Sequence, residues 1–452
     1  MMSGRILSVA QKLSKDFTGE NLNFKSISTD TRSIAKGALF VALEGKNFDG
    51  NEFISEAERK GAIAAIVSKK LKSNLPQIEV EDTKIALGIL AKSWRSNFKL
   101  PVIAITGSNG KTTVKELISS IFKQTYKICI TRENNNNEVG LPMTLIDLEE
   151  KDEVLVLELG ANHPGEISYL SSIAEPTIGL ITNVGPSHLE GFGSVNDVAK
   201  AKGEILDYLS PIDGTAIINA DDSFYSYWKN KSKARNTITF GTDENADCFI
   251  ASQIEYINGN SLFKICLPDK TLIDVDLPLL GSHNILNALA ASLVGYISGI
   301  KPKDIVSGLS SVKKVKGRLC PLLGKKKSTI LDDTYNANPI STKAAIDYLS
   351  SFEGKRIFIF GDMAELGSSK EKFHSEIGRY AIGKCDIFFT IGDLAKLASI
   401  EFGSGSESFD NKTKLISRIE SYLDKDVMVL VKGSRFMKME SIIDELVQKN
   451  DG

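Results

Sequence analysis

The stretch PVIAITGSNGKTTVKELI, which begins at residue 101, has the residue types that hold a nucleotide phosphate. An apolar run leads into a loop with Gly107 and Gly110, followed by Lys111 and Thr112. Glycines let backbone N–H groups approach phosphate oxygens, the lysine reaches the β- and γ-phosphates, and the hydroxyl can bind Mg²⁺. The usual spacing G-x-x-x-x-G-K-[ST] is broken, because Ile105 stands where its first glycine belongs. The physical requirements are still met, so the stretch predicts a nucleotide site; the alternative is a strand–helix turn with a chance Gly-Lys-Thr.

A magnesium–nucleotide site needs a carboxylate on a neighbouring strand. Glu158 ends the apolar run VLVLE, where a buried acid is costly without a cation. His188 follows the apolar run TIGLI and so lies at the carboxyl end of an expected strand, and His163 can face the same cleft. Any one histidine is more often structural than a ligand. His283 is interpreted as a capping residue and His374 as part of a surface helix.

The stretch SVNDVAKAKGEILDYL predicts a helix with Ser194 as its N-cap. Lys202 falls on the apolar face of this helix, with Val198 and Ile205, whereas Lys200 points away. A lysine in an apolar stripe is unusual. One reading is a side chain that snorkels to water or to a carboxylate. The other is a buried lysine with a lowered pKa, whose neutral amine can add CO₂ to give a carbamate suited to Mg²⁺.

These residues require strands and helices that bring them together. Residues 1–98 alternate short strands and helices, and residues 99–317 repeat this pattern with longer apolar runs. Such alternation implies a mainly parallel sheet with helices on both faces. Residues 318–452 repeat it again, with apolar runs that end in polar residues, as in STILDDTYNANP and DVMVLVKGSR. Ligands bind beyond the carboxyl ends of such strands. We therefore expect an α/β protein of three domains: a substrate-binding domain, a central P-loop-type domain and a C-terminal Rossmann-like domain.

The bulk composition excludes several classes of function. A chain of 452 residues is too long for one core and suggests about three domains. A net charge of −2 gives no nucleic-acid footprint and no polybasic membrane surface. Five scattered cysteines indicate free thiols in a reducing cytoplasm. No signal peptide is expected, and no run approaches the ~18 apolar residues of a membrane span. We expect a cytoplasmic monomer.

Motifs over nearly the whole chain resemble the Mur ligases, the ATP-dependent amide ligases of peptidoglycan synthesis. TGSNGKTT is similar to their phosphate loop, which also lacks the first glycine. STDTRSIAKGALFVALEGKNFDGNEFISEA resembles their N-terminal domain, which holds the UDP part of the substrate. YNANP, GDMAELG and GANHPGEI are typical of the branch that adds D-alanyl-D-alanine to UDP-N-acetylmuramoyl-tripeptide. The D-N-P-R signature of the diaminopimelate-adding branch is not found. Departures are limited to Thr31 and Ser108, and both keep a hydroxyl.

The resemblance implies a role for individual residues. The expected catalytic residues are Lys111, Glu158, His188, Lys202 and Arg318. The expected ATP-binding residues are Gly107, Ser108, Asn109, Gly110, Lys111, Thr112, Thr113, Asn284, Asn287, Arg318 and Asp333. Two Mg²⁺ ions are expected, one on Thr112 and Glu158, the other on His188 and carbamylated Lys202. The residues expected to bind the UDP-muramoyl-peptide are Ser28, Asp30, Arg32, Asn136, Asn137 and Glu138. Those expected to bind the dipeptide are Asn336, Asn338, Lys432, Ser434 and Arg435.

Within these sets, the resemblance implies that the two asparagines of HNILN contact adenine, Arg318 the γ-phosphate and Asp333 the ribose. Plainer readings stay open at this stage. The NNNN run can be a polar loop, and KGSR can be a solvated helix turn. Asp333 and Asn336 can be turn formers after a strand. Arg318 can pair with a surface acid.

The chemistry that the resemblance implies is activation of a carboxylate for amide formation. The γ-phosphoryl group of ATP would convert the tripeptide carboxylate into an acyl phosphate, which the amine of D-alanyl-D-alanine attacks. Two rival functions remain. One is a sister ligase, either another Mur ligase or a folylpolyglutamate synthetase. The other is a nucleotide-gated binding module without ligation chemistry, although a switch has no need of a second ligand platform.

Overall fold

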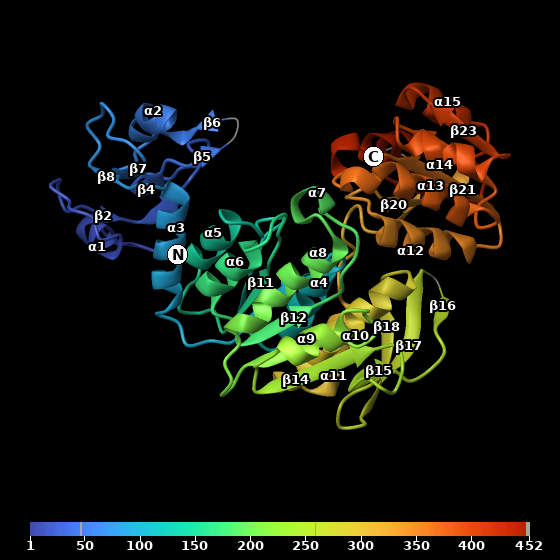
Figure 1. The fold of residues 1–452 in the computed structure, drawn as a ribbon, viewed down its shortest axis with the longest axis horizontal. Coiled ribbons are helices and arrows are strands. Elements are labelled where there is room, and N and C mark those ends of the chain that lie inside the picture. The colour runs from blue at the N-terminus through green and yellow to red at the C-terminus, as the bar shows by residue number, and fades with distance from the viewer. Residues whose placement is uncertain (46–47, 258, 449–452) are drawn as a thin grey trace.

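The structure, a computed structural model, describes residues 1–45, 48–257 and 259–448. Three parts follow one another along the chain (Figure 1), and the N-terminal and C-terminal parts stand on either side of the central one. Each part has its own sheet with helices packed against it. The expected α/β fold with a mainly parallel central sheet is confirmed.

The N-terminal part is built on a small parallel sheet with the strand order β3-β4-β7-β8. Two short antiparallel pairs accompany this sheet, β1 with β2 and β5 with β6. The strands are β1 (Gly4–Arg5), β2 (Asn23–Phe24), β3 (Ser26–Ser28), β4 (Ala38–Val41), β5 (Glu44–Gly45), β6 (Phe48–Asp49), β7 (Ala64–Val67) and β8 (Gln77–Glu79). The helices are α1 (Ile6–Lys12), the 3₁₀ helix η1 (Gly50–Phe53), α2 (Ile54–Arg59) and α3 (Thr83–Arg95).

Helix α3 fastens the N-terminal part to the central part. It begins where the side chain of Asp82 accepts hydrogen bonds from the N–H groups of Lys84 and Ile85. Its buried residues belong to a core that also contains residues of the central part. The contact is close, because a Cβ atom added at Gly88 would lie 2.3 Å from the hydroxyl of Tyr169. The two parts therefore share one core at this junction.

The central part has a ten-stranded sheet with the order β10-β11-β9-β12-β13-β14-β15-β17-β16, in which β18 also pairs with β17. The strands are β9 (Val102–Thr106), β10 (Ile128–Ile130), β11 (Val154–Glu158), β12 (Ile178–Ile181), β13 (Thr215–Asn219), β14 (Asn236–Gly241), β15 (Cys248–Ile250), β16 (Glu255–Ile257), β17 (Asn260–Cys266) and β18 (Leu272–Leu277). The helices are α4 (Lys111–Phe122), α5 (Gly140–Ile146), α6 (Glu166–Ala174), α7 (Leu189–Phe192), α8 (Val195–Gly203), η2 (Glu204–Tyr208), α9 (Tyr225–Lys231), α10 (Ser282–Ile297) and α11 (Pro302–Ser310).

Strand β9 shows why the central strands are apolar along their whole length. Successive side chains of a strand point to opposite faces of the sheet. Val102 and Ala104 enter the core that includes α5 and α6, whereas Ile103 and Ile105 enter the core that includes α4 and α10. Both faces are covered, so every position of the strand is buried. The pairs from β10 to β15 are parallel, and those from β15 to β18 are antiparallel.

The C-terminal part has a six-stranded sheet with the order β19-β20-β24-β21-β22-β23, parallel except for the edge strand β19. The strands are β19 (Cys320–Leu323), β20 (Thr329–Asp333), β21 (Lys355–Gly361), β22 (Ile387–Ile391), β23 (Ser406–Phe409) and β24 (Val427–Lys432). The helices are η3 (Lys325–Lys327), α12 (Pro339–Ser350), η4 (Gly367–Ser369), α13 (Lys370–Ala381), α14 (Ala395–Phe402), α15 (Lys412–Glu420), η5 (Arg435–Met437) and α16 (Glu440–Leu446).

The expected surface helix of His374 is present, whereas the expected capping role of His283 was wrong. His374 does lie on a helix, α13, but its side chain is fully buried. Its Nε2 accepts the N–H of Met363 at 2.8 Å, and its Nδ1 lies 2.6 Å from the carbonyl of Lys370, the group it donates to. His283 does not cap α10, because Gly281 is the N-cap residue and no side chain accepts a bond there. His374 lies on the buried face of α13 together with Ile377 and Ala381, three and seven residues further on, so helix periodicity does carry a signal of its burial.

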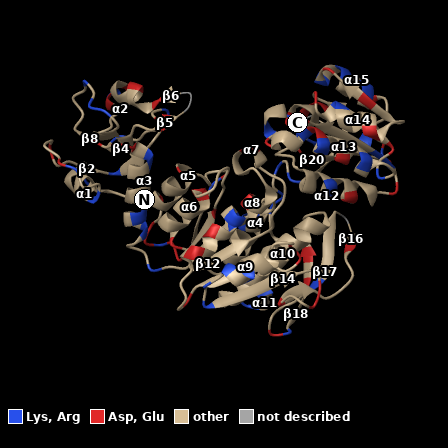
Figure 2. Ribbon diagram, viewed as in Figure 1, with Lys and Arg blue, Asp and Glu red and all other residues tan. Residues whose placement is uncertain are grey.

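Charged residues of both signs are interspersed over all three parts (Figure 2). This distribution agrees with the near-neutral net charge of the chain. Within the described part of the chain, no helix combines the length and the apolar character needed to cross a membrane.

Candidate active site

The phosphate loop joins β9 to α4, and its two glycines are required by space. A Cβ atom at Gly107 would lie 1.9 Å from the hydroxyl of Thr182, and one at Gly110 would lie 2.4 Å from Oδ1 of Asn287. Both glycines also have positive φ angles, 147° and 81°. The side chain of Lys111 turns back and donates to the carbonyl of Gly107 at 2.7 Å. The loop thus has the conformation that phosphate binding needs without a third glycine.

Part of the loop backbone is already bonded to the neighbouring strand connection. The N–H of Ser108 donates to the carbonyl of Asn183, and the N–H of Asn109 donates to the Oδ1 of the same residue, both at 2.9 Å. The next N–H groups belong to the first turn of α4, where an α-helix leaves its donors without intrahelical acceptors. These donors, together with the positive end of the helix, form the anion-binding end of the loop.

Glu158 ends β11 beside the loop, opposite Ile105 of β9. Its residue is only 3% exposed. One carboxylate oxygen accepts the amide N–H of Asn136 at 2.7 Å, and the other oxygen, Oε2, is buried without a partner among the described residues. A buried carboxylate oxygen without a donor is costly unless a cation binds it. Glu158 therefore fits a divalent cation held jointly with the Thr112 hydroxyl and nucleotide oxygens.

No three His, Cys, Asp or Glu side chains of the described residues gather into a preformed metal cage. Each expected ligand set consists of two protein side chains, one of them a hydroxyl or a lysine, and stays a prediction. Mg²⁺ commonly keeps several waters and takes one or two carboxylates plus substrate phosphates. The side chains that are present suit such an ion only when the nucleotide is bound as well.

Lys202 is buried, as its place on the helix predicted. The residue is 1% exposed, and its Nζ lies 5.5 Å from the ring centroid of Phe192. Burial, assisted by the nearby charge of Lys111, lowers the pKa of Lys202 to about 7. The ammonium does not snorkel out of the protein. Lys200, by contrast, is largely exposed and pairs with Asp197 at 3.0 Å. The predicted helix is shorter than expected, because α8 ends at Gly203 and continues as the 3₁₀ helix η2.

His188 lies between β12 and α7, with a left-handed backbone of φ 52°. Its Nδ1 is 2.6 Å from a carboxylate oxygen of Glu365, which belongs to the C-terminal part. This contact holds the pKa of the Glu365 carboxyl below its ordinary value. The N–H of Leu189 also donates to the carbonyl of Glu365 at 2.8 Å. His163 faces the same cleft, as expected, and its ring contacts Glu166 at 3.0 Å.

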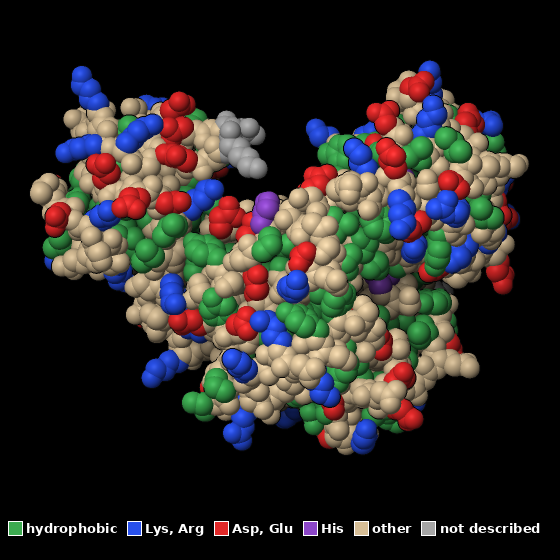
Figure 3. All heavy atoms as spheres, viewed as in Figure 1, with side chains coloured by type: hydrophobic (Ala, Val, Ile, Leu, Met, Phe, Trp, Pro, Cys, Tyr) green, Lys and Arg blue, Asp and Glu red, His purple; other side chains and the backbone are tan. Residues whose placement is uncertain are grey.

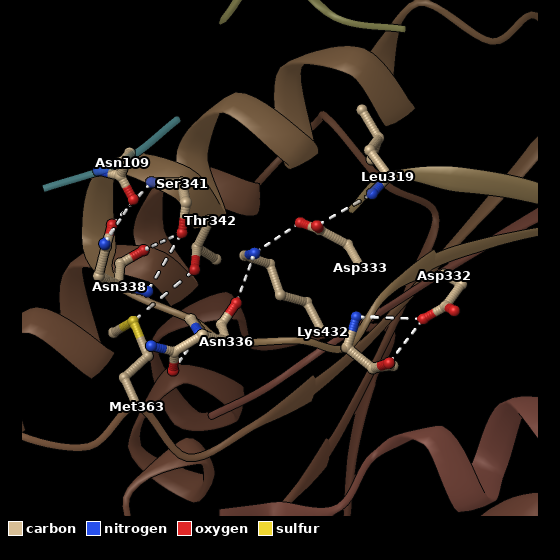
Figure 4. Close-up of polar contacts among 12 residues, drawn as sticks. Asn109, Leu319, Asp332, Asp333, Asn336, Asn338, Ser341, Thr342, Met363 and Lys432 are labelled. Carbon is tan, nitrogen blue, oxygen red and sulfur yellow. Dashed lines mark hydrogen bonds and ion pairs between the residues drawn. The ribbon is translucent and has the colours of Figure 1, made fainter. Parts of the chain in front are cut away.

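A direct contact between the central and C-terminal parts is made at the phosphate loop (Figure 4). Asn338 is the N-cap of α12, where its side chain accepts the N–H of Ser341 and completes a capping box. The amide N–H₂ of the same side chain donates to Oδ1 of Asn109 at 2.7 Å. The residue that starts α12 therefore also touches the nucleotide loop.

The other polar residues of the C-terminal part bond mainly to one another. Lys432 is buried and donates to the carboxylate of Asp333 at 2.5 Å and to the carbonyl of Asn336 at 3.0 Å (Figure 4). The hydroxyl of Ser434 accepts the N–H of Ala364 at 2.6 Å. Arg435 is exposed and pairs with Glu440 at 3.0 Å. Asp333 does more than form a turn after a strand. Its carboxylate also accepts the N–H of Leu319 and so connects the beginning of the C-terminal part to β20.

These groups meet around a cavity of about 470 Å³ between the central and C-terminal parts. The surface of Figure 3 is hollowed between the two outer parts, above the central one. Predicted residues that line the cavity are Ser108, Asn109, Gly110, Lys111, Thr112, Asn136, Asn137, Glu138, Glu158, His188, Arg318, Asn336 and Asn338. Predicted residues outside its lining are Gly107, Thr113, Lys202, Asn284, Asn287, Asp333, Lys432, Ser434 and Arg435.

Arg318 is oriented by an aromatic ring that the sequence interpretation overlooked. Its guanidinium carbon lies 4.0 Å from the ring centroid of Tyr335, and its Nε is buried without a partner. It forms no ion pair with any described acid, so pairing with a surface carboxylate is not what the structure shows. Tyr335 stands inside the quoted motif YNANP, so an aromatic residue beside the polar strand end was the available signal. Glu365, in GDMAELG, was overlooked in the same way.

The expected adenine contacts lie at the start of α10 and are buried. The side-chain amide of Asn284 donates to the carbonyl of Leu280 at 2.8 Å, and that of Asn287 donates to Asn284 at 3.1 Å. Burial lowers the pKa of the adjacent His283 to about 4, and its Nδ1 has no partner among the described residues. These asparagines keep only part of their bonding capacity for a base, and their role stays a prediction.

The residues expected at the UDP end lie away from this cavity. Asp30 and Arg32 form an ion pair at 2.7 Å and line a mostly apolar cavity of about 590 Å³ in the N-terminal part. Ser28 does not line it, because its hydroxyl bonds to the backbone of Asp30. Val139 of the central part completes the wall. Asn137, which precedes it closely, lines the nucleotide cavity. The chain segment that follows β10 therefore contributes residues to the walls of both cavities.

Comparison with known proteins gives the class to which this fold and site belong. Three family models match consecutive segments: Mur ligase family, catalytic domain, at residues 23–95; Mur ligase middle domain, at 105–295; and Mur ligase, glutamate ligase domain, at 317–435. The chain belongs to the Mur ligase family, as its motifs indicated.

Within the family, the chain is similar to proteins of one enzymatic step. It is 38% identical over 449 residues to the UDP-N-acetylmuramoyl-tripeptide--D-alanyl-D-alanine ligase of Escherichia coli (strain K12), covering 99% of each chain. A crystal structure of MurF from Acinetobacter baumannii matches with a TM-score of 0.93 and 34% identity, over 99% of this chain and 100% of that one. MurF ligase from Thermotoga maritima in complex with ADP matches with a TM-score of 0.85 and 30% identity, over 93% and 96%.

Proposed function

We propose that this protein is an ATP-dependent ligase that joins D-alanyl-D-alanine to UDP-N-acetylmuramoyl-tripeptide. The product is the pentapeptide precursor of peptidoglycan, and ADP and phosphate are released. The relative from Escherichia coli carries this step in its name and covers nearly the whole chain. The structural observation that carries the proposal is the unpartnered buried oxygen of Glu158 beside the phosphate loop. A cation on this oxygen suits a nucleotide triphosphate held by Lys111 and the first turn of α4.

The reaction requires an activated carboxylate, because a carboxylate and an amine do not condense in water. The terminal carboxylate of the tripeptide attacks the γ-phosphorus of ATP, and an acyl phosphate forms as ADP leaves. The amine of D-alanyl-D-alanine then attacks the acyl carbon, and phosphate leaves with the C–O electron pair. Both steps bring anionic groups together, so the site must supply fixed positive charge.

The chain supplies that charge from two sides of the cavity. Lys111 lies on the central side and has only one hydrogen bond, to the carbonyl of its own loop. Arg318 lies at the start of the C-terminal part, over the ring of Tyr335, and its Nε has no partner among the described residues. We assign Lys111 to the β- and γ-phosphates and Arg318 to the γ-phosphate. Mg²⁺, when bound, neutralises phosphate charge, with Thr112, Glu158, His188 and carbamylated Lys202 as the residues that would hold it.

Both outer parts contribute to the same site. The Asn109–Asn338 hydrogen bond and the His188–Glu365 contact join the central and C-terminal parts at the cavity. Asn336 and Asn338 line it and are proposed to receive the dipeptide together with Lys432, Ser434 and Arg435, of which Lys432 donates to the carbonyl of Asn336. Closure on the substrates would exclude water, to which an acyl phosphate is vulnerable. The cavity around Asp30 and Arg32 is proposed to hold the UDP end.

We propose a cytoplasmic, monomeric enzyme. All five cysteines are free in the structure, although three of them are buried where a disulfide would be protected. Free thiols throughout a chain are typical of a reducing compartment. The proposed substrates are small molecules, in keeping with a net charge of −2.

The test is mass spectrometry of the product formed from ATP, D-alanyl-D-alanine and UDP-muramoyl-tripeptides with either lysine or diaminopimelate at the third position. We expect the pentapeptide product and phosphate release that requires all three substrates. Glutamate with a folate acceptor, and single amino acids with shorter UDP-muramoyl-peptides, serve as controls for the sister ligases. Rapid ATP hydrolysis that does not depend on the UDP-linked peptide would contradict the ligase assignment and favour a nucleotide-gated module.

A further inference from the structure

Lys115 is a buried lysine that the proposed chemistry does not use. It lies on α4, one helical turn after Lys111, and the residue is 1% exposed. Its Nζ donates to the carbonyl of Thr131 at 2.8 Å and lies 3.1 Å from a carboxylate oxygen of Glu116. The Glu116 side chain is 38% exposed, so this ion pair is half in solvent. Lysines are almost never fully buried without a specific partner. The buried partner here is the Thr131 carbonyl.

Thr131 connects this lysine to the strand that carries Glu158. It follows the last residue of β10 and is itself 1% exposed. Its N–H donates to the carbonyl of Val156 at 3.0 Å, and its hydroxyl oxygen accepts the N–H of Glu158 at 3.1 Å. Its carbonyl accepts the ammonium of Lys115. All three polar groups of Thr131 are therefore used, two of them on β11 and one on α4.

The segment that begins at Thr131 makes a second contact with Glu158, through Asn136. The side-chain amide of Asn136 donates to one oxygen of the Glu158 carboxylate at 2.7 Å. The carbonyl of Asn136 accepts the N–H of Gly160 at 2.8 Å, just beyond the end of β11. Glu158 is thus held at its backbone by Thr131 and at its carboxylate by Asn136. The other carboxylate oxygen has no partner in the part of the chain that the structure describes.

We infer that Lys115 is a positioning residue for Glu158, acting through Thr131 and the segment 131–137. The inference rests on the proposed function, because it takes Glu158 as a ligand of the nucleotide-bound cation. A charged donor makes a shorter and stronger hydrogen bond than a neutral one. An apolar side chain of similar length would fill the space but leave the Thr131 carbonyl unpaired. The segment could then shift, and both contacts with Glu158 would shift with it.

The test compares Lys115→Met with Lys123→Met, a change at an exposed lysine one residue beyond the same helix. The readout is the affinity for Mn²⁺ in the presence of ADP, measured by electron paramagnetic resonance on the full chain. Groups that orient a metal ligand typically alter metal affinity or activity by about 10–100-fold when changed. We expect Lys115→Met to weaken Mn²⁺ binding by about tenfold or more and Lys123→Met to leave it unchanged. The Mg²⁺ concentration for half-maximal ligation should rise in parallel.

A second variant tests whether Thr131 carries the effect. Thr131→Val removes the acceptor of the Glu158 N–H while keeping the shape of the side chain, and it should also weaken Mn²⁺ binding. The double variant Lys115→Met with Thr131→Val should bind Mn²⁺ about as weakly as the worse single variant, because residues in one network are not additive. Fully multiplicative losses would mean that Lys115 does not act through Thr131.

Stability measurements separate positioning from a merely structural role. If Lys115→Met unfolds at lower urea but binds Mn²⁺ with ADP as tightly as the unchanged protein, the inference is wrong. Should that variant not fold, Lys115→Gln takes its place, since it keeps a shorter, neutral donor, and an unchanged Mn²⁺ affinity there would overturn the inference equally. A wrong assignment of Glu158 as a cation ligand would give a different result. In that case Glu158→Gln would leave the Mn²⁺ affinity of the otherwise unchanged chain intact.

Discussion

On the central side of the cavity, Glu158 has a buried carboxylate oxygen without any partner among the described residues. On the C-terminal side, both oxygens of Asp333 are occupied, one by Lys432 and the other by the N–H of Leu319. The difference separates two kinds of polar group. Groups with unused bonding capacity are suited to a ligand that is yet to bind, whereas mutually bonded groups hold the fold together. A family motif alone does not distinguish them.

The largest effect is expected at Asp333, which is one of the mutually bonded groups. Asp333→Ala leaves the buried ammonium of Lys432 without its carboxylate, and removing one partner of a buried pair costs roughly 3–5 kcal/mol. We expect that loss in the free energy of unfolding, measured by urea denaturation. Adding Lys432→Met to the same chain should recover much of it. A fully stable Asp333→Ala protein would mean that the pair is not structural.

The milder change Asp333→Asn tests the expected ribose contact in a protein that folds. If the contact exists, the KM for ATP should rise more than the KM for D-alanyl-D-alanine. The reverse order would move Asp333 to the dipeptide site.

Lys111→Ala tests a group that is expected to bind the ligand. The lysine bonds only to the carbonyl of its own loop, so its loss should leave the fold intact. Turnover should fall by about 10²–10³-fold, the cost of removing one donor that stabilises transition-state charge. Circular dichroism should be unchanged while phosphate release is lost. An unfolded variant would mean that Lys111 is needed for the fold instead.

Lys202→Ala tests whether a buried lysine can hold a ligand once it is carbamylated. We expect a loss of about 10–100-fold in activity, partly restored by bicarbonate or short carboxylic acids that replace the carbamate. Lys200→Ala, at the exposed neighbour, should behave like the unchanged enzyme. Because the pKa of Lys202 is lowered to about 7, its neutral amine is lost as the pH falls below 7, and activity should fall with it. A high-resolution structure with ATP and Mg²⁺ that shows a free ammonium would refute the carbamate.

The smallest effect is expected at His374, which is buried in the C-terminal part with the charge of Asp362 nearby. Burial lowers its pKa in the folded state, so it stays neutral there. Its contribution to stability is present above the unfolded pKa of about 6.5 and is lost as the pH falls toward its folded value. As the pH falls from 7.5 to 5.5, the free energy of unfolding should drop more than it does in His374→Gln. Equal pH dependence of the two proteins, measured by urea denaturation, would show that His374 titrates normally.

Much of the fold and part of the site were predictable from residue patterns. Apolar runs such as VIAIT and VLVLE can only be strands covered on both faces, and the glycines and Lys111 announced the phosphate loop. The burial of Lys202 followed from helix periodicity, because that face of the helix carried Val198 and Ile205. The burial of His374 was overlooked, although the same periodicity places it on one helix face with Ile377 and Ala381. The individual roles of site residues and the domain boundaries stay predictions.

The sequence by itself determined the classes of strand and helix, the phosphate loop and the buried lysine of α8, because periodicity and backbone requirements are local properties. Only the tertiary structure decided which polar groups are free. Glu158 and Asp333 both follow apolar runs and look alike in sequence. One keeps an oxygen without a partner among the described residues, because Asn136 donates to the other oxygen and Thr131 bonds only to the backbone of Glu158. The other is saturated because a lysine 99 residues away in the chain reaches it from the neighbouring strand. Bonding capacity depends on what distant segments bring into contact, and no local pattern records that.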